Sequence, residues 1–166
     1  WGQRKLLMSE IYFLTKYGDL SKKVVYAGAA RGDHLLYLSK LFPEHEFELW
    51  DPNPFHKDLH DHPKFTVNQA YFTDEVDKSY KKDVIMFWSD SRTGDPAKGM
   101  GSFEEAVDEN MTMQSKWHKL SNAKMSMLKF RLPYYIPGTV QPNTDYKYLD
   151  GEIVLQIWAP MTSTET

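Results

Sequence analysis

Four ionisable side chains stand where they could do chemistry: Lys5, Asp90, Lys129 and Glu152. Lys129 closes an apolar predicted strand, and a partly desolvated lysine in such a place can act as a general base. Asp90 follows another predicted strand, next to the crevice where open α/β sheets gather their ligands. Taken singly, each is better explained as an ordinary solvated residue, since charged side chains are mostly exposed. The spacing alone does not bring the four together.

A glycine-rich turn predicts nucleoside binding. Residues 24–33, VVYAGAARGD, run from an apolar strand through Gly28 and Gly32 into a helix. Glycine lets a backbone approach a ligand closely, and such a unit opens the crevice of an α/β domain. The pattern lacks G-x-G-x-x-G and Gly-Lys-Ser/Thr, which argues against a complete dinucleotide fingerprint and a Walker phosphate loop. A small adenosine-bearing ligand is therefore expected.

Asp51 stands about 20 residues beyond this turn, where a carboxylate accepts hydrogen bonds from ribose hydroxyls. The alternative is an ordinary loop aspartate before a proline. His56, His60 and His62 lie near two aspartates but between Pro54 and Pro63, a setting typical of a loop, so no metal site is expected. The better candidates for stacking on bases are Tyr134 and Tyr135, which follow the strand closed by Lys129.

The elements that must position these residues alternate between helix and strand. Apolar spacing predicts helices over residues 4–17, 33–42 and 103–120, and strands over 24–29, 46–50, 65–67, 83–89, 123–128 and 146–158. Asp33 is expected to cap the second helix and Pro43 to end it. The apolar run at 83–89 is typical of a central strand buried on both faces. The pattern predicts an α/β fold with a mostly parallel, doubly wound sheet and an antiparallel end, turning at Asp150-Gly151.

The bulk properties of the 166 residues favour a single domain over residues 1–160, followed by a polar tail at 161–166. Because the chain begins at Trp1, we expect a trimmed or fragmentary chain. The absence of cysteine excludes disulfides and fits a reducing compartment. The formal net charge of −3 requires any nucleic-acid binding to use a local basic patch. No apolar run approaches the roughly 20 residues of a membrane span.

Five stretches of the chain together resemble one family. They are WGQRKLLMSE, VVYAGAARGDHLLYL, FWSDSR, LKFRLPY and DGEIVLQI. In this order, and over nearly the whole chain, they are similar to the motifs of the poxvirus-type mRNA cap-specific 2′-O-methyltransferase family. In poxviruses such a protein is also the small regulatory subunit of poly(A) polymerase. The resemblance implies a Rossmann-like methyltransferase fold and a divergent viral relative.

The resemblance implies a role for each matching residue. Lys5, Asp90, Lys129 and Glu152 would form a Lys-Asp-Lys-Glu tetrad in which Lys129 is the base for a ribose 2′-hydroxyl. The implied cofactor is S-adenosyl-L-methionine, with S-adenosyl-L-homocysteine as product and no metal required. The implied cofactor contacts are Gln3, Tyr26, Gly28, Ala30, Gly32, His34, Asp51, Asn53, Phe72, Thr73 and Asp90. The implied RNA contacts are Arg92, Arg131 and Tyr134.

The implied partners are RNA, at the capped 5′ end of mRNA, and a poly(A) polymerase catalytic subunit, with no membrane. The implied location is the cytoplasm of an infected cell, or the virion.

Three positions depart from the family pattern, namely Arg31 for a proline, Asn53 for a basic residue and Ile136 for an acidic cap contact. Three alternatives therefore stay open: an internal-ribose methyltransferase for ribosomal or transfer RNA, a non-catalytic RNA-binding or polymerase-processivity subunit, and an NAD-dependent oxidoreductase supported only by the turn and Asp51.

Overall fold

The computed structural model describes residues 2–91, 100–130 and 148–154. The α-helices of these residues are α1 (Gly2–Tyr17), α2 (Leu35–Leu41), α3 (Lys57–His60), α4 (Asp74–Ser79) and α5 (Met100–Ser121), with short 3-10 helices η1 (Gly18–Leu20) and η2 (Tyr80–Lys82). The strands are β1 (Lys23–Ala27), β2 (Glu46–Trp50), β3 (Phe65–Asn68), β4 (Ile85–Ser89) and β5 (Ser126–Leu128). The helices and strands predicted before residue 130 are confirmed, with ends shifted by a few residues. Helices α3 and α4 were not predicted.

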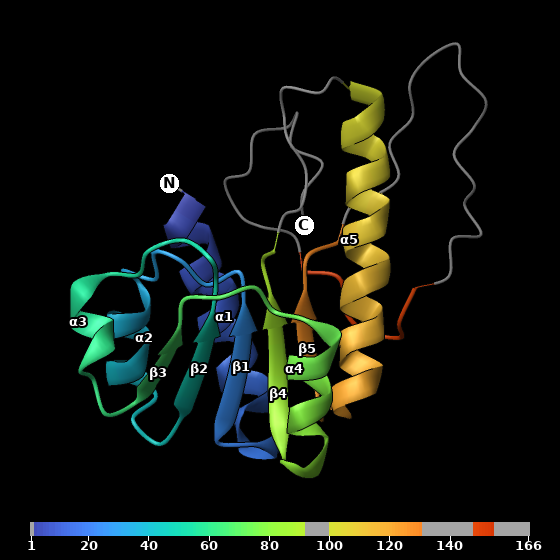
Figure 1. Ribbon diagram of the computed structural model, residues 1–166. Helices are drawn as coiled ribbons and strands as arrows, with labels where there is room; N and C mark the ends of the chain where they lie inside the picture. The colour runs from blue at the N-terminus through green and yellow to red at the C-terminus, as the bar shows by residue number, and fades with distance from the viewer. Residues whose placement is uncertain (1, 92–99, 131–147, 155–166) are drawn as a thin grey trace.

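The five strands form one parallel sheet in the order β3-β2-β1-β4-β5. The order runs outward from β1 through β2 to β3, then returns to the other side of β1 with β4 and β5. This reversal, visible in Figure 1, confirms the α/β, doubly wound prediction. In such sheets, ligands bind at the carboxyl ends of the strands where the order reverses. The described sheet has no antiparallel end. Of the predicted final strand, residues 148–154 are described and form no strand, and the rest lie outside the described residues.

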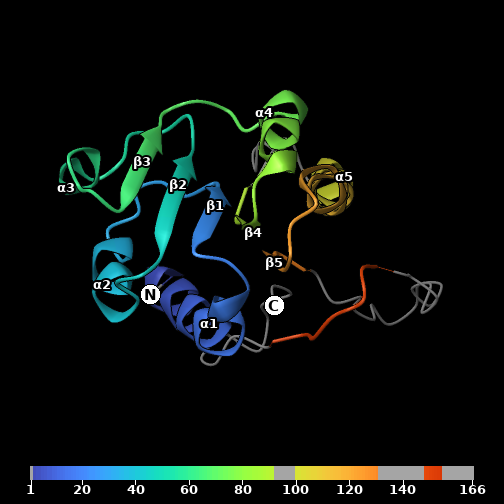
Figure 2. The same ribbon diagram turned by 90° about the horizontal axis from the view of Figure 1, so that it is seen from below.

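Helices cover both faces of the sheet, with α1 and α2 on one side and α4 and α5 on the other (Figure 2). The strand side chains alternate between two cores for this reason. Val24 and Tyr26 of β1 pack toward α1 and α2, whereas Val25 and Ala27 pack toward α5 and η2. All five residues of β4 are buried, which confirms the prediction of a central strand covered on both faces.

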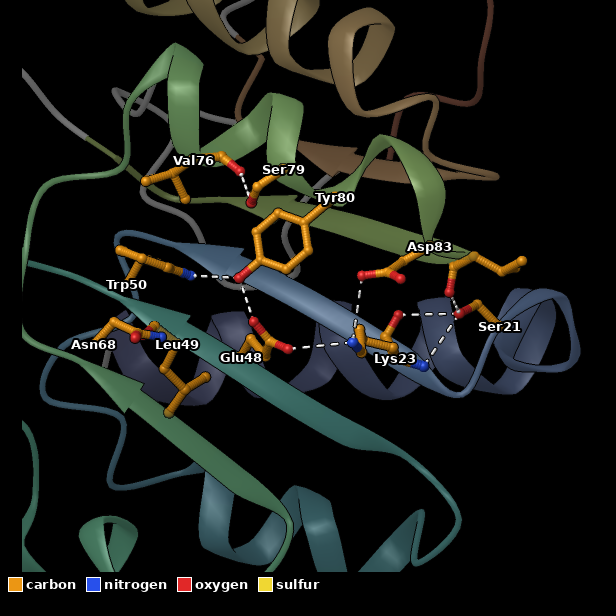
Figure 3. Close-up of polar contacts among 11 residues, drawn as sticks. Ser21, Lys23, Glu48, Leu49, Trp50, Asn68, Val76, Ser79, Tyr80 and Asp83 are labelled. Carbon is orange, nitrogen blue, oxygen red and sulfur yellow. Dashed lines mark hydrogen bonds and ion pairs between the residues drawn. The ribbon is translucent and has the colours of Figure 1, made fainter.

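A polar network crosses the α4 side of the sheet and ties β2 to β1 and η2 (Figure 3). The Glu48 carboxylate accepts a hydrogen bond from the Tyr80 hydroxyl and lies 3.3 Å from Lys23 Nζ. Trp50 Nε1 donates to Tyr80 Oη at 3.0 Å. Burial, followed by the hydrogen bond to Glu48, raises the pKa of the Tyr80 hydroxyl. These contacts fix the last residue of β2, which leads directly into the predicted ligand site.

The start of α2 corrects one prediction, because Asp33 does not cap this helix. The N-cap residue is His34, already helical at φ −70° and ψ −20°, and no side chain caps the first turn. Leu35 N–H instead donates to the Gly32 carbonyl at 3.0 Å. The Asp33 carboxylate lies 3.5 Å from Arg31 Nε and 3.9 Å from His56 Nε2. It therefore stabilises the surface of the turn rather than the helix end.

The histidine-rich segment predicted as a loop contains one helical turn, α3. His56 Nδ1 accepts the N–H of Asp58, and His62 Nδ1 accepts the N–H of Lys64. Both ring nitrogens therefore accept hydrogen bonds from backbone N–H groups two residues further along the chain. Within the described ranges, no group of three or more His, Cys, Asp or Glu side chains is arranged to hold a metal ion. No helix in the same ranges is long and apolar enough to cross a bilayer.

Asp77 is a fully buried carboxyl in α4, the helix that packs against α5, and this burial raises its pKa from 3.8 to about 7. The folded state thus holds this proton more tightly than the unfolded chain. The contribution of the Asp77 carboxyl to the free energy of unfolding is fully present below pH 3.8 and is lost as the pH rises through about 7. We predict that Asp77→Asn unfolds in urea with a free energy at least about 1 kcal/mol above wild type at pH 8. Its stability should also vary less between pH 4 and 7.

Asp74→Asn is the matched control on the same helix. Hydrogen bonds from Lys116 and Trp117 lower the pKa of the Asp74 carboxyl. Its stabilising contribution is therefore present at neutral pH and lost in acid, so this variant should be less stable than wild type at pH 8. A gain in stability at pH 8 from both substitutions, or from neither, would contradict the assignment.

Candidate active site at the carboxyl end of the sheet

Two of the four predicted catalytic side chains meet where β4 and β5 end. Asp90 follows β4 and Lys129 follows β5, and Lys129 Nζ donates to Asp90 Oδ1 at 2.7 Å. The two strands pair in parallel as far as Ser89 and Leu128, which makes the next residue on each strand a neighbour of the other. The side chains of Lys129 and Asp90 are 21% and 24% exposed, so the pair is largely enclosed but still reachable from solvent.

The Lys129–Asp90 pair opens into a cavity of about 610 Å³ that is lined by residues of α1, of β5 and of the segment 148–154. Lys5, near the start of α1, and Glu152 line the same cavity, together with Tyr26 from β1. All four predicted tetrad residues therefore face one space. Its volume lies in the range of small-molecule binding sites.

Glu152 lies at a different part of this cavity from the Lys129–Asp90 pair. Its carboxylate accepts a hydrogen bond from the Tyr12 hydroxyl at 2.9 Å and forms an ion pair with Lys16. Hydrogen bonds from Lys16 and then Tyr12 lower the pKa of Glu152. Tyr12 stands about 10 Å further along the helix axis than Lys5, given the rise of an α-helix. The structure thus joins Lys129 to Asp90 and joins Glu152 to the second half of α1.

The glycine-rich turn owes its glycines to contacts within the protein. Gly28 and Gly32 have φ of 79° and 75°, which residues with a Cβ rarely adopt. A Cβ on Gly28 would lie 2.6 Å from the backbone nitrogen of Ser91 and 2.7 Å from the carbonyl carbon of Asp90. A Cβ on Gly32 would lie 3.0 Å from Leu59 Cδ1. Gly28 therefore makes room for the chain that carries Asp90, in addition to any ligand.

Asp51 is buried at the end of β2 and anchors the turn from the other side. Its Oδ2 accepts the Ala30 N–H at 3.2 Å. Its Oδ1 accepts the backbone N–H and the side-chain amide of Asn53 at 2.8 and 2.9 Å. A carboxylate oxygen offers about two acceptor positions, so Oδ1 is filled and Oδ2 keeps one. The three predicted cofactor contacts Ala30, Asp51 and Asn53 thus form one hydrogen-bonded unit.

His34 and Glu10 form a buried pair between α1 and the start of α2. His34 Nε2 lies 3.0 Å from Glu10 Oε1, and the two side chains are 8% and 0% exposed. Burial raises the pKa of the neighbouring Tyr26 hydroxyl, and the charges of Glu10 and Asp90 raise it further. Sequence reasoning missed Glu10, although it stands at helical spacing between Leu7 and Leu14 on the buried face of α1.

Phe72 and Thr73 both have structural roles at the start of α4. The Phe72 ring centroid lies 4.8 Å from that of Trp117 and 5.5 Å from that of Phe87. Thr73 Oγ1 accepts the Val76 N–H at 3.3 Å as the cap of α4. The remaining predicted contacts lie outside the described side chains, namely Gln3, Arg92, Arg131 and Tyr134.

A parallel sheet that reverses its order beside β1, with a glycine-rich turn and an anchored aspartate at the reversal, defines a Rossmann-like α/β protein. The model of one protein family, described as poly A polymerase regulatory subunit, matches residues 1–166. The chain belongs to this family. The poly(A) polymerase regulatory subunit family indicated by the five sequence motifs is thereby confirmed, whereas the interpretation of the chain as a divergent viral relative stays a prediction.

The close contact at Gly28 predicts a large loss of stability on Gly28→Ala. The added methyl group would meet backbone atoms that cannot turn away, and the positive φ adds strain. We expect the free energy of unfolding to fall by more than about 2 kcal/mol in urea denaturation. Gly151→Ala is the control, because a Cβ there has nothing within 4 Å and should change stability little. Equal effects of the two substitutions would contradict this account of the turn.

The bonds of Asp51 predict that Asp51→Asn costs more than Asn53→Ala. An asparagine at position 51 would turn an amide donor toward a backbone donor, either the Ala30 N–H or the Asn53 N–H. A buried donor without an acceptor costs about 1–3 kcal/mol. Asn53→Ala removes one side-chain donor and leaves both backbone bonds, so its cost should be under about 1 kcal/mol. Urea denaturation of both variants measures the difference, and a costlier Asn53→Ala would refute the anchoring role.

Proposed function

We propose that the protein transfers a methyl group from S-adenosyl-L-methionine to a ribose 2′-hydroxyl near the 5′ cap of mRNA. The observation that carries the proposal is the Lys129–Asp90 pair, held at 2.7 Å where two strands end and open to a cavity of about 610 Å³. Membership of the poly A polymerase regulatory subunit family supports it, since the five sequence motifs resemble those of the poxvirus-type cap-specific 2′-O-methyltransferases.

The residues around the glycine-rich turn fit the cofactor. Asp51 Oδ2 keeps an acceptor position that suits a ribose hydroxyl, and the carboxylate is itself held rigidly by Ala30 and Asn53. Tyr26 of β1 lines the cavity together with Asp90. When bound, S-adenosyl-L-methionine supplies a methyl group on a positively charged sulfur. The negative charge of Asp90 favours a cation at this place.

Lys129 is the proposed base. When the methyl group passes from sulfur to the 2′-oxygen, the sulfur would keep the electron pair of the broken bond, and Lys129 Nζ, in its unprotonated form, would take the proton that the hydroxyl releases. Asp90 orients Nζ through the hydrogen bond at 2.7 Å and balances the ammonium that results. Lys5 lines the same cavity from α1, and its positive charge favours a polyanionic substrate such as RNA.

The test is transfer of labelled methyl groups to matched capped and uncapped RNAs. Lys129→Ala should lower the rate at least about 100-fold, as expected when a general base is lost. Binding of S-adenosyl-L-homocysteine should stay near wild type, because Lys129 acts on the RNA hydroxyl. Lys124→Ala is the matched control, since this exposed lysine lies two residues before the start of β5, at the end opposite to Lys129, and should keep full activity.

Each outcome of this assay decides between named functions. Transfer to the capped RNA alone supports cap methylation. Equal transfer to both RNAs would replace it with methylation of internal ribose. If wild type transfers no methyl group but still binds S-adenosyl-L-homocysteine, the proposal is contradicted and a non-catalytic subunit is favoured. Loss of that binding in Lys129→Ala would show that Lys129 is not the base.

The family also supports a partner, and we propose that the protein associates with RNA and a poly(A) polymerase catalytic subunit. Because the formal net charge is −3, RNA must bind at a local basic surface rather than through the overall field. Association with a polymerase requires no proton transfer. It is therefore separable from methylation, and Lys129→Ala should retain it.

A further inference from the structure

Lys129 lies just beyond the point where sheet pairing ends. The register of β4 and β5 runs from Phe87↔Ser126 to Ser89↔Leu128. Lys129 is the next residue along the chain after this register. Backbone N–H and C=O groups in such a partly buried place need hydrogen-bond partners. The partners of these groups help to set the position from which the Lys129 side chain extends.

Gln114 of α5 supplies a partner for both groups. Its side-chain Oε1 accepts the Lys129 N–H at 2.9 Å, and its Nε2 donates to the Lys129 carbonyl at 3.4 Å. The same Nε2 donates to the Asn110 carbonyl, one turn earlier on α5, at 3.1 Å. The Gln114 side chain is 1% exposed. It therefore extends the pairing of β5 by one residue, as a neighbouring strand would.

A primary amide is the group that this place requires. It carries an acceptor and a donor side by side on one planar group, which matches the N–H and C=O of a single residue. A carboxylate of the same length has acceptors only, and a thioether of similar size offers neither strong partner. Burying the amide is tolerated because its oxygen and nitrogen are both bonded.

We propose that Gln114 is a positioning residue for Lys129, an inference that rests on the proposed function. Gln114 acts by fixing the backbone of Lys129, which directs Nζ to Asp90 across the end of β4. Gln114 acts only through Lys129 and takes no part in the chemical step. Because a shift of about 1 Å at a reacting group can cost about 100-fold in rate, a backbone clamp of this kind has a measurable effect.

The first measurement compares methyl transfer in two variants and a control. Gln114→Met keeps the size and removes both bonds to Lys129, whereas Gln114→Glu keeps the acceptor for the Lys129 N–H. We expect kcat to fall about 10- to 100-fold in Gln114→Met and less in Gln114→Glu. The KM for RNA and the affinity for S-adenosyl-L-homocysteine should stay within about 3-fold of wild type. Gln114→Glu remains informative if Gln114→Met does not fold.

The matched control is Ser121→Ala on the same helix. Ser121 is also fully buried, and its Oγ donates to the Trp117 carbonyl at 2.8 Å. The substitution removes a buried side-chain bond to the backbone of α5 without touching Lys129. It should leave kcat at the wild-type value. An equal loss of kcat in Ser121→Ala and Gln114→Met would overturn the inference, because it would reflect a general loosening of α5.

A second measurement does not depend on catalysis. Trace labelling of lysine amines with acetic anhydride, read by peptide mass, reports how reactive Nζ of Lys129 is. In Gln114→Met we expect Lys129 to label several-fold faster relative to Lys124, because its amine is no longer held against Asp90; Ser121→Ala should leave the ratio unchanged. Unchanged labelling in Gln114→Met overturns the inference, and so does altered labelling with a wild-type kcat. If wild type transfers no methyl group, the proposed function fails, and altered labelling still supports the clamp on Lys129.

Discussion

The backbone of residues 90–91 passes directly against Gly28, and the arrangement of the site depends on this contact. It is locked by two hydrogen bonds at the end of β1. The Gly28 N–H donates to the Trp50 carbonyl at 2.8 Å, and the Asp90 N–H donates to the Ala27 carbonyl at 3.0 Å. The turn is thus fixed to β2 on one side and to β4 on the other. Because of this, Asp51 after β2 and Asp90 after β4 both lie at the carboxyl end of the sheet, on either side of β1.

These two carboxylates are held in different ways. Asp51 is buried and bound by backbone N–H groups, an arrangement that gives a rigid acceptor. Asp90 is paired with Lys129, and both side chains are largely enclosed, so removing either partner would be costly in free energy. The backbone next to the pair is held as well, by the bonds of Gln114 to the N–H and carbonyl of Lys129.

The fold could be predicted from the sequence because strands buried on both faces appear there as continuous apolar runs. The apolar runs of β1 and β4 follow from helices on both faces, and their alternation with helices predicts the parallel order. Asp90 and Lys129 were found because each ends such a run. Gln114 was missed, since a side-chain bond to a backbone 15 residues away leaves no periodic pattern. Helix α3, with four residues, is too short to show helical spacing, and the Asp33 cap failed because His34 is already helical.

Glu152 and the Lys129–Asp90 pair line the same cavity but are held in position by different kinds of contact. The resemblance groups it with Lys129, whereas the structure bonds it to Tyr12 and Lys16 on α1. Both members of that ion pair are nearly half exposed, so water screens the attraction and the net stabilisation is small. Residues 150–154 are all exposed and form no strand, so little apolar burial fixes them. The free energy separating this position of Glu152 from one nearer Lys129 is therefore small. The parallel pairing of β4 with β5 determines the position of the Lys129–Asp90 pair, whereas only exposed contacts determine the position of Glu152, the fourth residue of the predicted tetrad.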